Sequence, residues 1–63
     1  MIVKLKCISN IDYSGDASDY LTVGKVYDGI KSEVGDIALV CDEGALIHDN
    51  VDDPVHAKWE VVE

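Results

Sequence analysis

The 63-residue sequence has no arginine, phenylalanine or glutamine, and it has few basic residues of any kind. Five lysines stand against thirteen aspartates and glutamates, which gives a formal net charge of −8 at pH 7. A surface of that sign repels phosphates, so direct nucleic-acid binding is disfavoured. Uninterrupted apolar runs are short, such as Ile37 to Val40, whereas a membrane-spanning helix needs about 20 apolar residues. We therefore expect neither a nucleic-acid ligand nor a membrane span.

Cysteine is also scarce: Cys7 and Cys41 stand far apart and show no C-x-x-C spacing. Small secreted proteins often use several disulfides to compensate for a small core, and one pair is too few for that class. The first residues also lack the basic and apolar segments of a signal peptide. We expect two buried free thiols in a reducing cytoplasm, with one Cys7–Cys41 disulfide as the alternative.

The residues that are abundant favour β-structure. Valine and isoleucine supply fifteen of the 63 positions, and hydrophobic residues make up 48 % of the chain. Side chains branched at Cβ fit a pleated strand better than a helix. In the first segment, Val3, Leu5 and Cys7 alternate with Lys4 and Lys6, which is the period of two expected for a strand with one buried face.

Turn residues divide the chain into short β-segments. Gly24, Gly35 and Gly44 mark turns, and Gly29 indicates a bulge or tight bend within a strand. The polar stretch from Asn10 to Asp19 is a loop in which Ser18 and Asp19 could begin one short helical turn. The predicted strands are Ile2 to Ser9, Lys25 to Ser32, Asp36 to Cys41, Ala45 to Asp49 and Lys58 to Val62. Five short strands at this spacing predict one small all-β domain over residues 1–63, either a barrel or a sandwich.

Three motifs carry a resemblance to a known family. They are Leu21-Thr22-Val23-Gly24-Lys25-Val26-Tyr27, Asp42-Glu43-Gly44, and the closing Trp59-Glu60-Val61-Val62-Glu63. In order and spacing they resemble small bacteriophage and prophage proteins that fold as five-stranded Src-homology-3-like barrels. The resemblance implies that Leu21 and Tyr27 anchor the core, that Gly24 makes a turn, and that Trp59 closes the barrel. It also implies the cytosol of a bacterial host as the location. Two departures are the acidic loop before the last strand and a tryptophan where phenylalanine is more usual.

The sequence offers little for catalysis or metal binding. Cys7 and Cys41 fall at inward strand positions, where a thiol acts as a small hydrophobe rather than a nucleophile. His48 and His56 stand eight residues apart, which does not match the close ligand pairs of zinc sites. The oxygen-rich stretch from Asp12 lacks the glycine and glutamate of a calcium loop. We predict a protein that is not an enzyme, with no catalytic residue, no metal site and no cofactor.

The most distinctive feature is an acidic stretch with no lysine between Glu33 and Asp53. It contains seven carboxylates: Glu33, Asp36, Asp42, Glu43, Asp49, Asp52 and Asp53. If successive turns share one side of a barrel, their charges form a field that attracts a basic protein. Tyrosines in the first loop could add aromatic anchors. The predicted partner-binding residues are Asp42, Glu43, Asp49, Asp52, Asp53, Tyr13 and Tyr20.

The function predicted from these features is a non-enzymatic phage-type accessory protein that binds a host protein through an acidic loop face, with inhibition of that protein as an open alternative to binding alone. One alternative is a DNA mimic, in which carboxylates occupy the phosphate sites of a nucleic-acid-binding enzyme. A second is a small structural protein that assembles with copies of itself through an unpaired strand edge. The simplest alternative for the charge is that it serves only solubility.

Overall fold

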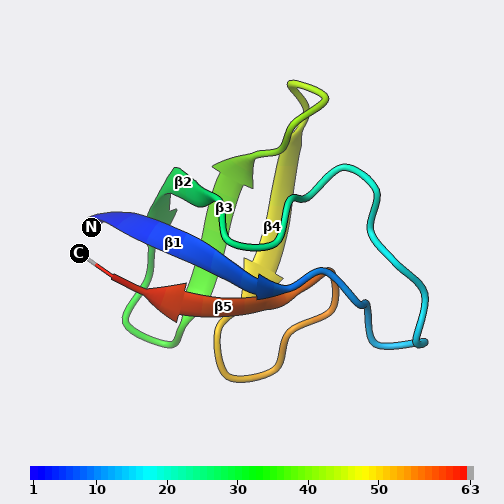
Figure 1. Ribbon diagram of the computed structural model, residues 1–63. Helices are drawn as coiled ribbons and strands as arrows, with labels where there is room; N and C mark the ends of the chain where they lie inside the picture. Colours follow the sequence, from blue (N-terminus) through cyan, green and yellow to red (C-terminus); the bar gives the residue numbers. More distant parts are fainter. Residues whose placement is uncertain (63) are drawn as a thin grey trace.

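The computed structural model describes residues 1–62 and shows an all-β fold. Its strands are β1 (Ile2–Ser9), β2 (Val26–Lys31), β3 (Asp36–Val40), β4 (Leu46–Asn50) and β5 (Lys58–Val61). They form one antiparallel sheet in the order β4-β3-β2-β1-β5, which curls into a half-barrel (Figure 1). Each strand boundary lies within one residue of the boundary predicted from the sequence. The fold is therefore compatible with the small Src-homology-3-like barrel that the motifs implied.

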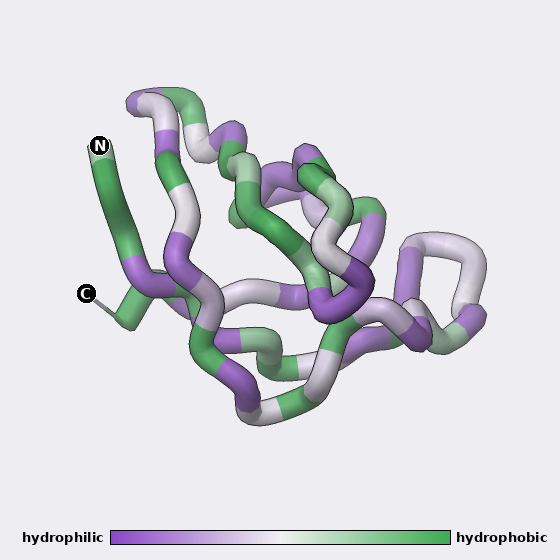
Figure 2. Tube along the Cα trace, turned by 90° about the horizontal axis from the view of Figure 1, so that it is seen from above, coloured by the Kyte–Doolittle hydropathy of each residue, from purple (hydrophilic) through white to green (hydrophobic). Residues whose placement is uncertain are grey.

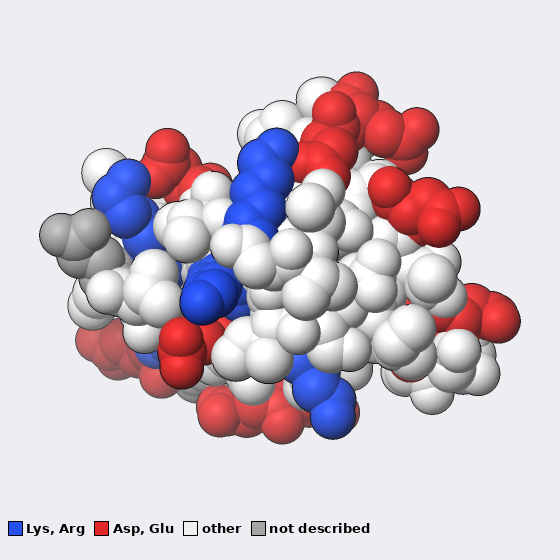
Figure 3. Space-filling view, viewed as in Figure 1, with Lys and Arg blue, Asp and Glu red and all other residues white. Residues whose placement is uncertain are grey.

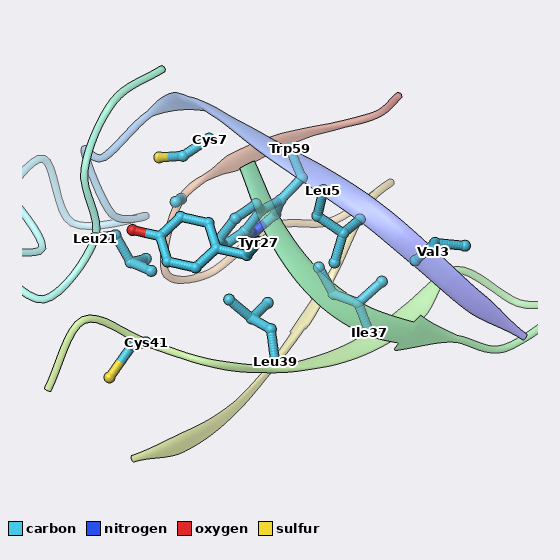
Figure 4. Packing of buried hydrophobic residues seen from close by; sticks show 10 residues of the cluster. Val3, Leu5, Cys7, Leu21, Tyr27, Ile37, Leu39, Cys41 and Trp59 are labelled. Atoms are coloured by element: carbon cyan, nitrogen blue, oxygen red, sulfur yellow. The ribbon is translucent and has the colours of Figure 1, made fainter. Parts of the chain in front are cut away.

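The core lies on the concave side of the sheet. In β1 the buried Val3, Leu5 and Cys7 alternate with exposed lysines, as the period of two predicted. In β3 burial alternates although the residues from Ile37 to Val40 are all hydrophobic, because Ile37 and Leu39 point inward and Val40 is exposed. Figure 2 shows the hydrophobic and hydrophilic stretches along the chain. Ten residues form the buried cluster: Val3, Leu5, Cys7, Leu21, Tyr27, Ile37, Leu39, Cys41, Ala57 and Trp59 (Figure 4).

Tyr27 and Trp59, which the resemblance implied separately as core residues, lie together in this cluster. The rings of Tyr27 and Trp59 meet edge to face, with centroids 5.9 Å apart. Trp59 is only 8 % exposed although it stands on β5 at the edge of the sheet. The structure thus confirms Leu21, Tyr27 and Trp59 as core residues.

The first loop differs from expectation because it contains no helical turn. The N–H of Leu21 donates to the carbonyl of Ser18 at 3.0 Å, which closes a single β-turn. The Ser18 hydroxyl donates to the carbonyl of His56 at 2.7 Å and so ties this turn to the loop before β5. Gly24 has φ +87°, so the turn predicted at this position is confirmed.

Gly29 does not form the bulge that its position suggested. It pairs in regular register with Val3 on one side and Leu39 on the other. A glycine is needed for space, since a Cβ atom there would lie 2.7 Å from the Ala38 carbonyl oxygen and 2.9 Å from Leu5 Cδ1. The register shift of the sheet lies instead in β1, between Cys7 and Ser9, where β1 pairs with β5.

Candidate functional site

The predicted acidic residues do not share one side of the barrel. β3 and β4 form a hairpin in which Val40 pairs with Leu46 and Asp36 pairs with Asn50. The turn with Asp42 and Glu43 therefore lies at one end of β4, and the loop with Asp52 and Asp53 at the other (Figure 1). Five strand residues separate the two groups by about 14–17 Å. The prediction of a single acidic face was wrong because consecutive hairpin turns alternate between the ends of a meander.

Asp49 is not a surface charge, because its side chain points inward and the residue is 8 % exposed. Its two carboxylate oxygens accept five hydrogen bonds, four from the backbone and one from an indole. The donors are the N–H groups of Asn50 (2.9 Å), Val55 (2.7 Å), His56 (3.0 Å) and Ala57 (3.2 Å), and Nε1 of Trp59 (2.8 Å). This carboxylate organises the loop between β4 and β5, so its assignment as a partner-binding residue is corrected.

The pKa of Asp49 reflects two opposed effects. Burial disfavours the charged form and by itself would raise the pKa. The hydrogen bonds from the Trp59 indole and the surrounding backbone N–H groups stabilise the carboxylate, and together they hold the pKa below its usual value. Asp49 is therefore a permanently ionised structural group at neutral pH.

The carboxylate of Asp42 also forms its hydrogen bonds within the chain. Its Oδ1 accepts from Lys25 Nζ at 2.5 Å and from the Tyr27 hydroxyl at 3.0 Å, and its Oδ2 accepts from Thr22 Oγ1 at 2.6 Å. The Lys25 ammonium is the largest influence, and it lowers the pKa of Asp42. Because Lys25 balances this charge, Glu43 is the carboxylate at this turn whose charge remains for a partner.

The two predicted tyrosine anchors have different roles. Tyr20 is half-buried against the core, and its hydroxyl lies 2.5 Å from His56 Nδ1. It therefore fastens the first loop to the loop after β4. Tyr13 is 80 % exposed, yet its backbone N–H donates to the carbonyl of Val55 at 3.0 Å. Tyr13 thus presents an exposed ring from a backbone that is bonded to Val55, which lies two residues after Asp53 in the β4–β5 loop.

Four exposed carboxylates do meet at the end of the sheet formed by the β2–β3 turn and the start of the β4–β5 loop. We call them the acidic end: Glu33, Asp36, Asp52 and Asp53. Asn50 holds both segments. Its Nδ2 donates to the Val34 carbonyl (3.4 Å) and to Asp36 Oδ1 (2.9 Å), and its Oδ1 accepts from the N–H groups of Asp52 (2.8 Å) and Asp53 (3.0 Å).

Sequence reasoning chose Asp52 and Asp53 correctly as exposed acids but did not select Glu33 and Asp36 to go with them. The alternation of turns between the two ends of a meander was the signal that could have grouped these four. Figure 3 shows the wider pattern: acidic side chains lie at several separate places around the rim of this view, with lysines between them.

An open apolar depression adjoins the acidic end on the convex side of the sheet. Met1, Ile30, Ile37, Ala38 and His48 line it, together with the polar residues Lys31, Ser32 and Asp36, and its volume is about 370 Å³. Ile30, Ala38 and His48 lie in one row across three strands. Asp36 belongs both to this depression and to the acidic end, so apolar and acidic surfaces are continuous here.

The cysteines are buried free thiols, as expected from the sequence. Burial raises the pKa of the Cys7 thiol, and the negative charge of Asp42 adds to that shift, so the thiolate is disfavoured. Among residues 1–62, no three side chains of His, Cys, Asp or Glu gather closely enough to hold a metal ion. The same residues include no helix of the length and apolarity needed to cross a bilayer.

Comparison with known proteins gives no match: no family model, no curated protein and no solved structure is significantly similar to this chain.

Proposed function

We propose that this protein is a non-enzymatic binding module of the bacteriophage type, which docks on a basic surface of a host protein through its acidic end. The observation that supports this proposal is the grouping of Glu33, Asp36, Asp52 and Asp53 on two turns that one asparagine side chain holds together. The bacterial cytoplasm is the compartment that we propose for this interaction, and inhibition of the bound protein is its proposed consequence.

The held backbone matters because binding costs less when the charged groups are already in place. Four carboxylates at one end produce a local field that steers a basic partner and raises its association rate. Such contacts at the rim of an interface weaken as salt rises, since exposed charges are screened beyond about 10 Å at 0.1 M ionic strength. The proposed interaction is therefore fast and salt-sensitive.

Tyr13 supplies the aromatic contact that charge alone does not provide. Its ring is 80 % exposed, and its backbone is bonded to the loop that carries Asp52 and Asp53. Tyrosine buries a large area at a small entropic cost and is enriched among residues that dominate binding energy. We propose that Tyr13 packs on the partner beside the acidic end.

The test is capture of proteins from a bacterial lysate at low and high salt, followed by affinity measurements with the captured protein after purification. The double variant Asp52→Lys/Asp53→Lys should abolish capture. The matched control is Asp16→Lys/Asp19→Lys, which changes the net charge equally but in the first loop, and it should retain capture. The proposal fails if both double variants behave alike or if retention ignores salt. Displacement of the captured protein by DNA would instead identify a DNA mimic.

A further inference from the structure

Of the two edge strands of the sheet, β4 is the less protected against pairing with an added strand. Among the described residues, β3 is its only neighbouring strand. The hydrogen-bond alternation of an antiparallel pair can be followed along it, because Cys41 N–H donates to the Ala45 carbonyl and Val51 N–H donates to the Gly35 carbonyl. By that alternation Ile47 and Asp49 bond to β3, whereas the backbone groups of Leu46 and His48 point away from it.

The outward backbone of β4 is open to a new strand. No backbone hydrogen bond within residues 1–62 joins Leu46 or His48 to any loop. Both residues are exposed, Leu46 to 62 %. Two residues facing one way present two N–H donors and two carbonyl acceptors, which is the pattern that strand addition uses.

The side chains of the two edge strands differ. Natural proteins block pairing at a sheet edge with charged residues, lysine above all. β5, at the other edge, carries exposed Lys58 and Glu60. β4 presents Leu46, Ile47 and His48, while its aspartate points into the core. The central part of the β4 edge thus lacks the charges that would prevent pairing.

Acidic residues flank this uncharged edge at both ends. Glu43 lies in the turn before β4, and Asp52 and Asp53 lie in the loop after it. A second copy of this chain fits poorly, because antiparallel pairing of two β4 strands would bring Glu43 of each toward Asp52 of the other. An added strand with basic ends meets attraction at both ends instead.

We propose that β4 accepts an extended segment of the partner protein as a sixth strand, with apolar residues over Leu46 to His48 and a basic residue at each end. The inference rests on the proposed function, because it specifies the kind of basic partner that binds. At about 3.4 Å per residue, a segment of six or seven residues spans β4 and reaches both acidic groups.

The probe is a synthetic peptide, Lys-Val-Thr-Val-Thr-Val-Lys, titrated into ¹⁵N-labelled protein while backbone amide signals are recorded. Two control peptides carry glutamate at both ends or N-methyl groups on alternate residues. The lysine-ended peptide should shift the amide signals of Leu46 and His48 and slow their hydrogen exchange, whereas Ile47 stays protected throughout. Neither control peptide should do so at the same concentration.

A proline substitution separates backbone pairing from side-chain contact. His48→Pro removes an N–H that does not bond to β3, so the hairpin ladder is kept. We expect it to weaken peptide binding about fivefold or more, in line with the loss of a hydrogen bond. His48→Ala keeps the N–H and should change the affinity less than about twofold. Thermal unfolding checks that both variants are folded. If the proline variant is unfolded, the hydrogen-exchange measurement on the unmodified chain tests strand addition by itself.

The outcomes distinguish this inference from the proposed function. Peptide-induced shifts of amide signals that are confined to Glu33, Asp36, Asp52 and Asp53 would overturn strand addition and leave the acidic end as the binding site. Equal binding of the N-methylated peptide would also overturn it. Concentration-dependent shifts at Leu46 and His48 without peptide would show that a second copy pairs with β4, which contradicts the proposed occupant.

Discussion

The indole Nε1 of Trp59 donates a 2.8 Å hydrogen bond to Oδ2 of Asp49, although β4 and β5, the strands that carry them, are not paired with each other. β4 and β5 are the two edges of the sheet, so this bond joins edges that backbone pairing leaves apart. Asp49 also holds the backbone of Val55, His56 and Ala57, which carry the chain from one edge to the other. A side-chain network, rather than a fifth pair of strands, closes this half-barrel.

Asp49→Ala should unfold the protein. The substitution leaves one indole N–H and four backbone N–H groups without their acceptor, and each unsatisfied buried group costs about 1–3 kcal/mol. A domain of this size has a total stability of only about 3–5 kcal/mol. Circular dichroism and urea titration should show loss of the cooperative transition. Asp53→Ala is the control, since its side chain is exposed, and it should change stability by less than about 0.5 kcal/mol. A cooperative, near-native Asp49→Ala would contradict the structural role.

Stability should fall in acid because the pKa of Asp49 is lower in the folded chain than in the unfolded one. In the unfolded chain the pKa of an aspartate is about 3.9. The unfolded chain therefore binds more protons as pH falls below that value, so the stabilisation is complete above about pH 4 and declines toward the folded pKa. Asp42 and Asp12 have lowered pKa values and act in the same direction.

The measurement is urea unfolding at pH steps from about 6 to about 2, in high salt, which screens repulsion among the thirteen acids. Carboxyl-carbon NMR of the folded protein should show Asp49 titrating below the value of about 3.9 that an aspartate has in an unfolded chain. An unfolding free energy that stays constant through this range would show that the Asp49 network does not stabilise the fold.

Trp59→Ala should cost about 3–5 kcal/mol and leave the chain largely unfolded, because it removes the largest core side chain. Trp59→Phe distinguishes the contribution of the aromatic ring from that of the indole N–H. It keeps an aromatic contact with Tyr27 but leaves Asp49 without its indole donor, and we expect a cost of about 1–3 kcal/mol. Chemical denaturation followed by circular dichroism measures both. A folded Trp59→Ala protein would contradict the position of β5 in the sheet.

Two tyrosine-to-phenylalanine substitutions form a matched pair. The Tyr27 hydroxyl accepts from the Thr22 N–H at 2.8 Å and donates to Asp42, so Tyr27→Phe should lose about 1–2 kcal/mol. Tyr13→Phe removes the same atom from an 80 % exposed ring and should be neutral within about 0.5 kcal/mol. Thermal melts of the two variants under one condition make the comparison. Equal losses of stability in the two variants would mean that the bonds of the Tyr27 hydroxyl to Thr22 and Asp42 do not stabilise the fold.

Strand positions and most of the core could be predicted because they depend on local pattern. Alternation along the first strand was enough to predict that Val3, Leu5 and Cys7 point inward. The turns predicted at Gly24 and Gly44 were also correct, because both glycines have the positive φ values that tight turns require. The first loop forms no helical turn, and its Ser18 hydroxyl instead makes a distant contact with the His56 carbonyl, 38 residues away. Local sequence contains no sign of that contact.

The candidate site was harder to predict, because the sequence does not show whether a given aspartate or glutamate is surrounded by water or by hydrogen-bond donors of the protein. Asp49 did have one signal, because it shares strand parity with the half-buried Ile47. Asp42 had none, as its partners Thr22, Lys25 and Tyr27 come from another part of the chain.

The sequence by itself determined the charge, the five strands, the turns and the inward residues, because these follow from composition and from a side-chain period of two. The tertiary structure decided which acids remain available to a partner. It buried Asp49 under five donors, paired Asp42 with Lys25, and placed Asp52 and Asp53 beside Glu33 and Asp36. Those outcomes depend on which distant N–H groups and cations the folded chain brings to each carboxylate, and that is a property of topology rather than of sequence pattern.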